Sequence, residues 1–154
     1  MSLLLVLNLR GKIDSTTPVR KALVELKVER RFSATVVPDD GPTLGMLKSC
    51  KDYVAWSPLD SKLLANLLKT RGMVSENRRL DQDALNSLGF KKYEDFADKI
   101  MKDGERLSAQ KGIRPFFRLS PPKGGYKLSS RRQASEKGIL GSNPKLAELV
   151  GRMV

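Results

Sequence analysis

The stretch LLLVLNL at residues 3–9 decides the fold, because it predicts a strand that other parts of the chain must cover. Successive side chains of a strand point to opposite faces of its sheet, and here both faces are apolar apart from Asn8. This pattern is typical of a central strand that is covered on at least one side. No Lys or Arg precedes the stretch, which is too short for the apolar region of a signal peptide or for a membrane span. We therefore expect a cytoplasmic protein without a membrane partner.

A helix and a second strand are predicted next. Thr17 is a suitable N-cap and Pro18 a favoured first helical residue, and apolar residues then recur at helical spacing to about Glu29. Residues 32–37 (FSATVV) are rich in β-branched side chains, and the turn residues 38–42 (PDDGP) end this predicted strand.

A second helix and a third strand complete this part of the chain. Thr43 is expected to cap a short helix that continues to about Lys51, and residues 53–56 (YVAW) predict a strand that stops at Ser57 and Pro58. The order β-α-β-α-β within about 55 residues predicts an α+β protein whose core is a small ferredoxin-like split sheet with two helices.

Residues 58–105 are predicted to be helical. Asp60 and Asp81 are candidate N-caps, Gly72 and Gly89 are candidate helix ends, and residues 93–103 carry a third apolar helical face. Nine Lys/Arg balance nine Asp/Glu in this segment. We therefore interpret it as a scaffold and not as a binding surface.

The net charge of +12 predicts an acidic partner, and most of the excess lies at one end of the chain. Residues 1–57 hold nine Lys/Arg against six Asp/Glu, whereas residues 106–154 hold eleven against two. We therefore divide the chain into a sheet domain (1–57), a helical extension (58–105) and an extended basic arm (106–154). The arm is expected to be irregular over residues 129–142 and to end in a short docking helix, whose apolar face is Leu146, Leu149, Val150 and Met153.

The first part of the arm, residues 106–132 (RLSAQKGIRPFFRLSPPKGGYKLSSRR), carries eight Lys/Arg and no Asp or Glu. Its prolines and glycines forbid a long helix and remove donors from any strand ladder. Cations that alternate with Phe and Tyr offer partners for phosphates and flat faces for bases, a pattern typical of nucleic-acid binding. Gly124 and Gly125 would allow the backbone to approach RNA closely.

The candidate RNA-binding residues come from this arm and from cations around the predicted sheet. The alternative for Phe116 or Phe117 is that the ring packs into the local core and does not contact RNA. The full set is Arg10, Lys12, Arg20, Arg30, Arg31, Lys48, Arg114, Phe116, Phe117, Arg118, Lys123, Gly124, Gly125, Tyr126, Lys127, Arg131 and Arg132.

The sequence lacks the residues that most often carry out catalysis. It has no histidine, which removes the commonest general base and metal ligand. A single cysteine, Cys50, excludes an internal disulfide and a Cys-rich zinc site, and we interpret it as a small buried apolar residue. The carboxylates near residues 39–40, 81–83 and 94–98 fit turns, helix caps and a solvated helix face. We predict no enzyme activity, metal, cofactor or small-molecule substrate.

Three stretches give the chain a family resemblance: PVRKAL at 18–23 through TLGMLK at 43–48, LLKTRG at 67–72 through LGF at 88–90, and FRLSPPKGGY at 117–126. The chain resembles the large-subunit ribosomal protein family L thirty in its archaeal and eukaryotic form, called L seven in eukaryotes. The resemblance implies a three-stranded antiparallel sheet with two helices on one face, and similarity to bacterial members over only the first 60 or so residues.

The same resemblance implies a non-catalytic constituent of the large ribosomal subunit that binds and stabilises ribosomal RNA during translation. Neighbouring ribosomal proteins and 5S-type RNA are further partners that it leaves open. Eukaryotic members usually carry a basic extension before the first strand, so a strand that begins at Leu3 favours an archaeal origin. Where the family commonly has histidine before the two prolines of the arm, this chain has Ser120.

Two alternatives remain at the level of sequence. A free regulatory module that binds RNA or duplex DNA outside the ribosome would share the charge and the arm. A small enzyme with a ferredoxin-like core would instead need a concave site that holds a perturbed carboxylate or lysine.

Overall fold

The strand predicted at residues 3–9 forms β1 (Leu3–Asn8), which lies inside the sheet as its apolar sequence requires. The computed structural model describes residues 2–154. In it, β1 pairs antiparallel with β2 (Ser33–Pro38) on one side and with β3 (Val54–Pro58) on the other. This unit corresponds to the small three-stranded core, and the α+β class is confirmed.

The complete sheet is larger than predicted, because the basic arm adds three strands to it. The strand order is β4-β2-β1-β3-β6-β5, where β4 is Phe117–Arg118, β5 is Ser129–Gln133 and β6 is Gly138–Ser142. β4 pairs antiparallel with β2, whereas β6 pairs parallel with both β3 and β5, so the sheet is mixed. The prediction of three strands was therefore incomplete, and the prediction that residues 129–142 are irregular was wrong.

β6 was missed in the sequence analysis because its glycines have low strand propensity. Glycine in a strand usually weakens it, but it also permits close approach of another backbone. A Cβ built at Gly138 would clash with the carbonyl oxygen of Arg132, and one at Gly141 would clash with the side chain of Gln133. Gly138 is needed for the contact with the backbone of β5, whereas Gly141 is favoured by its φ of 79°. No local pattern reveals either requirement.

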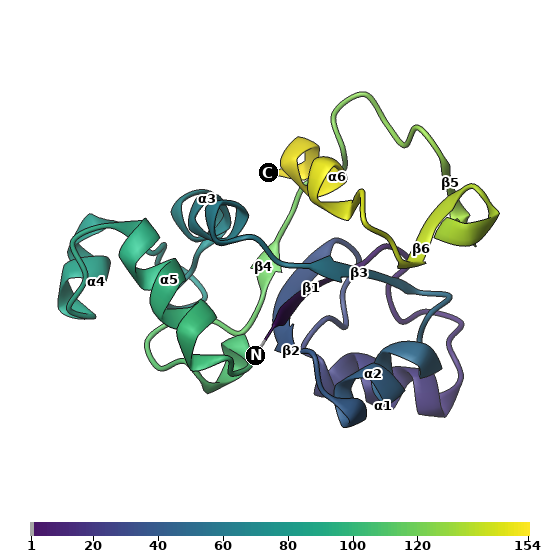
Figure 1. Cartoon of the computed structure of the whole chain (residues 1–154), viewed down its shortest axis with the longest axis horizontal. Helices are drawn as coiled ribbons and strands as arrows, with labels where there is room; N and C mark the ends of the chain where they lie inside the picture. The colour runs from purple at the N-terminus through teal and green to yellow at the C-terminus, as the bar shows by residue number, and fades with distance from the viewer. Residues whose placement is uncertain (1) are drawn as a thin grey trace.

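Helices and packed loops cover both faces of the sheet, as Figure 1 shows. On one face, α1 (Thr17–Glu25) and α2 (Gly41–Ser49) bury Leu4 and Val6 of β1. On the other, Leu3, Leu5 and Leu7 belong to a larger cluster with α3 (Ser61–Arg71), α4 (Gln82–Ser87), α5 (Tyr93–Asp103) and α6 (Leu146–Met153). Short 3-10 turns at Leu107–Ala109 and Ala134–Glu136 complete the elements.

Three helix ends differ from the prediction. The N-cap of α1 is Thr16, and Thr17 is the first helical residue instead of the cap. α1 ends at Glu25 and not near Glu29, because Lys27 adopts a left-handed φ of 61°. The amide of Val28 donates to the carbonyl of Leu23 and that of Lys27 to the carbonyl of Val24, which is the Schellman pattern without its usual glycine. The cap of α2 is Asp40 and not Thr43, since the Asp40 carboxylate accepts from the Thr43 amide at 2.8 Å.

Other predicted elements are confirmed. The Asp81 carboxylate caps α4 by accepting from the Ala84 amide at 2.9 Å, and α5 spans residues 93–103 as predicted. α3 follows Asp60, whose side chain makes no capping hydrogen bond. No helix among residues 2–154 has the length and apolar composition needed to cross a bilayer.

Asn8 is the polar exception in β1, and its burial has a structural reason. Its side-chain amide donates to the carbonyl of Val28, and its side-chain oxygen accepts from the amides of Arg10 at 3.0 Å and Gly11 at 2.8 Å. A buried polar side chain is tolerated when its hydrogen bonds are made. Asn8 therefore ties the loop after β1 to the segment that leads into β2.

Cys50 is confirmed as a buried residue, and this predicts an unreactive thiol. Burial raises the pKa of the Cys50 thiol to about 11. The thiolate is the reacting form, so the native protein should react with a disulfide reagent at pH 8 on the order of a hundredfold more slowly than the urea-unfolded chain. Stopped-flow absorbance would measure both rates on the one cysteine of the chain. Equal rates would contradict the buried position.

Candidate nucleic-acid interface

The inner half of the basic arm (residues 106–122), which we call the inner arm, is docked on the body of the protein. The amide of Arg114 donates to the carbonyl of Met73 at 2.7 Å, and the hydroxyl of Thr35 donates to the carbonyl of Pro115 at 2.7 Å. β4 then pairs with the edge of β2, and the amide of Ser120 donates to the carbonyl of Met153 in α6. The arm therefore runs along the β2 edge of the sheet and reaches α6 before it leaves the body.

The outer half, which we call the outer arm (residues 123–132), forms the loop that leaves the region of α6 in Figure 1 and continues into β5. Arg152 in α6 holds its turn by donating from Nη1 to the carbonyls of Gly125 at 2.8 Å and Lys123 at 3.3 Å. Gly124 and Gly125 have φ values of 78° and 72°, and a Cβ at either would meet open space. The backbone conformation itself thus accounts for both glycines.

The outer arm presents four exposed cations, Lys123, Lys127, Arg131 and Arg132. None takes part in either of the two ion pairs found among the described residues. Like charges without a nearby carboxylate repel one another unless a polyanion relieves them. This segment is consequently a positively charged surface without a paired carboxylate among the described residues.

The three aromatic candidates have different environments. Phe117 is only 1% exposed and belongs to the core. The prediction that it contacts RNA was therefore wrong, and of the two phenylalanines it is the one that packs into the core. Phe116 is half-buried, with the guanidinium of Arg114 4.6 Å and that of Arg118 6.0 Å from its ring centroid. Tyr126 is also half-buried and packs against the core.

The hydroxyl of Tyr126 is buried and finds no hydrogen-bond partner within residues 2–154. Burial raises the pKa of this phenol, and the nearby Arg31 guanidinium opposes the shift. Tyr126 therefore remains neutral and offers its partly exposed ring as a flat surface beside Arg31.

Four further candidates lie in the loops that follow β1 and precede β2. Arg10 stacks over the ring of Tyr53 at 5.0 Å, and Arg31 stacks over Phe32 at 4.7 Å while its Nε donates to the carbonyl of Leu9. Arg30 is exposed, and Lys12 is paired with Glu29 at 2.7 Å. Because β4 pairs Arg118 with Ser33, the loop before β2 lies next to the inner arm. The positive charge of Lys12 is already compensated by Glu29.

The remaining two candidates, Arg20 and Lys48, are not part of this surface. They lie on α1 and α2, which cover the opposite face of the sheet. Arg20 also donates to the carbonyl of Ser15 at 3.1 Å. The structure thus places them on other elements than the arm cations with which the sequence grouped them.

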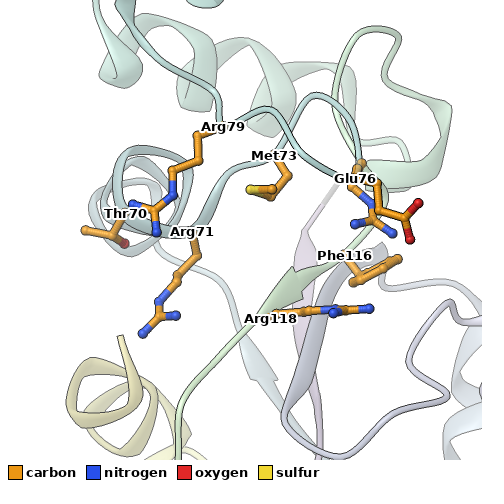
Figure 2. A pocket seen from close by; sticks show the side chains of 8 residues that line it. Thr70, Arg71, Met73, Glu76, Arg79, Phe116 and Arg118 are labelled. Atoms are coloured by element: carbon orange, nitrogen blue, oxygen red, sulfur yellow. The ribbon is translucent and has the colours of Figure 1, made fainter.

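The structure adds two arginines that the sequence analysis missed. Arg71 at the end of α3 and Arg79 after it join Arg114, Phe116 and Arg118 around a cavity of about 130 Å³, which we call the arginine pocket (Figure 2). Its other lining residues are Thr70, Met73 and Glu76. The balanced charge of residues 58–105 concealed both arginines. The available signal was local, since Arg71, Arg78 and Arg79 lie within nine residues that contain one acid, Glu76.

The described part of the chain holds no group of three or more His, Cys, Asp or Glu side chains placed to bind a metal ion. What it does hold is a set of exposed arginines and lysines, with half-buried aromatic rings, on an α+β body. This arrangement is typical of proteins that bind nucleic acid.

Comparison with known proteins identifies the family. Residues 4–54, from β1 to the first residue of β3, match the family model described as Ribosomal protein L30p/L7e. Over 99% of its length the chain is 36% identical to 98% of the large ribosomal subunit protein uL30 of Ignicoccus hospitalis. It is also 33% identical to the proteins of that name from Nitrosopumilus maritimus and Nanoarchaeum equitans, with coverage of 97% and 100% of both chains, respectively. The chain belongs to the L30p/L7e family of ribosomal proteins.

Proposed function

We propose that this chain, a non-catalytic structural constituent of the large ribosomal subunit in the cytoplasm, holds ribosomal RNA mainly through its basic arm. Its membership of the L30p/L7e family supports the ribosomal role. The observation that supports the choice of surface is the outer arm, with four exposed cations and no acidic residue. Large-subunit ribosomal RNA is the polyanion that neutralises it.

Contacts with the RNA backbone would come from Lys123, Lys127, Arg131 and Arg132, with Arg10, Arg30 and Arg31 extending the surface toward the loops of the sheet. At Gly124 and Gly125 an added Cβ would meet open space, so the backbone of this turn can approach RNA closely. Phe116 and Tyr126 supply ring faces for bases or ribose. Phe117 has no part in this contact because it is buried.

The proposal predicts salt-sensitive association with large subunits. Each lysine or arginine that neutralises a phosphate releases counterions, so affinity falls steeply as salt rises. In gradient sedimentation of a native extract, the chain should travel with large subunits at moderate salt and be released at high salt. If most of the chain stayed at the top of the gradient at moderate salt, it would act as a free regulatory module.

Finer partners belong to the same proposal. A wide groove between α3 and α5 is lined by Lys62, Lys69, Lys91 and Lys92, together with Glu94 and Asp98. Mixed charge of this kind suits a neighbouring ribosomal protein. Phosphates of 5S-type RNA would bind the arm by the same chemistry as other ribosomal RNA. Cross-linking within intact subunits followed by mass spectrometry would identify the neighbours of this groove and of the arm.

We retain the division into residues 1–57, 58–105 and 106–154 as a proposal about function. Since β4 and β6 of the last segment pair with β2 and β3 of the first, the division concerns what each segment binds and not how it folds.

A further inference from the structure

The arginine pocket joins two segments that are distant in sequence. Thr70, Arg71 and the residues from Met73 to Arg79 come from the end of α3 and the loop after it, whereas Arg114, Phe116 and Arg118 come from the inner arm. A backbone bridge pairs Met73 with Arg79, and the Arg114 amide binds the Met73 carbonyl. Figure 2 shows side chains from both segments around the same space.

Contacts that leave their charge intact hold three of these arginines in place. Arg114 and Arg118 lie over the ring of Phe116, at 4.6 Å and 6.0 Å from its centroid. Arg71 donates from Nη2 to the hydroxyl of Ser120 at 2.7 Å. Rings and hydroxyls orient a guanidinium without neutralising it.

The pocket carries an uncompensated positive charge. Four arginines face one carboxylate, Glu76, and none of these five groups forms an ion pair in the part of the chain that the structure describes. Several cations that line one pocket repel one another unless an anion is bound. The planar guanidinium matches the oxygens of a phosphate with paired hydrogen bonds.

The size of the pocket restricts the ligand. Pockets for small-molecule ligands usually have volumes of roughly 300–1,000 Å³, whereas this one has about 130 Å³. A metabolite of ordinary size would not be enclosed, but a single phosphodiester group could enter while the rest of its chain stayed outside.

We propose that the arginine pocket binds one phosphodiester group of large-subunit ribosomal RNA, which Arg71, Arg79, Arg114 and Arg118 contact together. This inference rests on the proposed RNA-binding function and extends it to the helical segment, which the sequence assigned to the scaffold. The bound phosphate links the end of α3 to the inner arm. Phe116 then acts as a positioning residue that orients two of the arginines.

The test compares adjacent arginines with the same charge. Arg78 and Arg79 are both exposed, but only Arg79 lines the pocket. Full-length R79Q should bind a large-subunit ribosomal RNA transcript about tenfold more weakly than the unchanged chain, and the slope of log affinity against log salt should fall by roughly one. R78Q should bind within about twofold of the unchanged chain. If binding depended only on non-specific charge attraction, both variants would lose affinity equally. Thermal unfolding of each variant excludes loss of fold as the cause.

Phosphate-ethylation interference adds a readout that net charge alone would not move. For the unchanged chain and R78Q, ethylation of one particular RNA phosphate should prevent binding. For R79Q, ethylation of that phosphate should no longer matter, while the other interfering positions stay the same. Phe116→Leu should weaken binding without changing the net charge, and Phe116→Tyr should restore it.

Equal affinities and identical interference patterns for R79Q, R78Q and the unchanged chain would overturn the phosphate site, while leaving RNA binding by the outer arm intact. If the unchanged chain itself failed to bind the transcript, the proposed function would fail instead. If R79Q bound the transcript normally but was lost from assembled subunits, the pocket would serve an acidic protein segment, which also overturns this inference.

Discussion

Replacing Phe117 by alanine is expected to destabilise the protein by about 3–5 kcal/mol, the usual cost of removing a buried phenyl ring. Phe117 is 1% exposed and pairs with Ala34 across the β4–β2 ladder, so its loss opens a cavity where the arm joins the sheet. Urea unfolding monitored by circular dichroism would measure the change in the free energy of unfolding.

Phe116→Ala is the matched control for this prediction. The two phenylalanines are adjacent, but Phe116 is half-buried and lines the arginine pocket. Its replacement should cost clearly less stability than that of Phe117, since its ring is only partly removed from water. Equal losses for both variants, or a loss below about 1 kcal/mol for Phe117→Ala, would contradict the core position of Phe117.

Neutralising the outer arm is expected to have the largest effect on RNA binding. In the quadruple variant K123Q/K127Q/R131Q/R132Q, affinity for large-subunit ribosomal RNA should fall by about 10²–10³ near physiological salt, and the salt slope by roughly three. The free energy of unfolding should change little, because these side chains are exposed and make no ion pair among the described residues. Filter binding over a salt series would measure both the affinity and the slope.

A second quadruple variant, K62Q/K69Q/K91Q/K92Q, removes the same charge from the groove between α3 and α5. We expect it to lower affinity much less, because these lysines share their groove with Glu94 and Asp98. If the two quadruple variants bound equally weakly, affinity would follow net charge and the arm would have no special role.

The elements that the sequence predicted well are those whose signals are local. β1 lies inside the sheet because five apolar residues and Asn8 fill both of its faces, and α5 follows a regular apolar stripe from residue 93 to 103. The end of α1 was missed because Lys27 takes the left-handed conformation that usually marks a glycine. β4 and β6 were missed because their pairing partners are distant in sequence and their own residues carry no strand pattern.

The candidate interface divides in the same way. Charge without counter-charge is visible in the sequence, so the cations of the outer arm were found, and the four of them remain exposed in the structure. Burial is a property of the whole fold, so the sequence could not decide which of Phe116 and Phe117 enters the core. The pocket was invisible because Arg71 and Arg79 reach Arg114 and Arg118 only when the inner arm docks against the end of α3.

By itself, the sequence therefore determined the α+β class, the central strand, the membership of a ribosomal protein family and the position of the basic arm. The class, the central strand and the arm follow from local periodicity, turn residues and charge balance, which act between residues close in the chain. The family follows instead from the resemblance of three stretches to known members and from the comparison with relatives. Only the tertiary structure decided that the arm completes a mixed six-stranded sheet, that Phe117 is core, and that four arginines from two segments converge. Each of these depends on long-range pairing, whose favourable contacts exist only after the chain has closed the intervening loops.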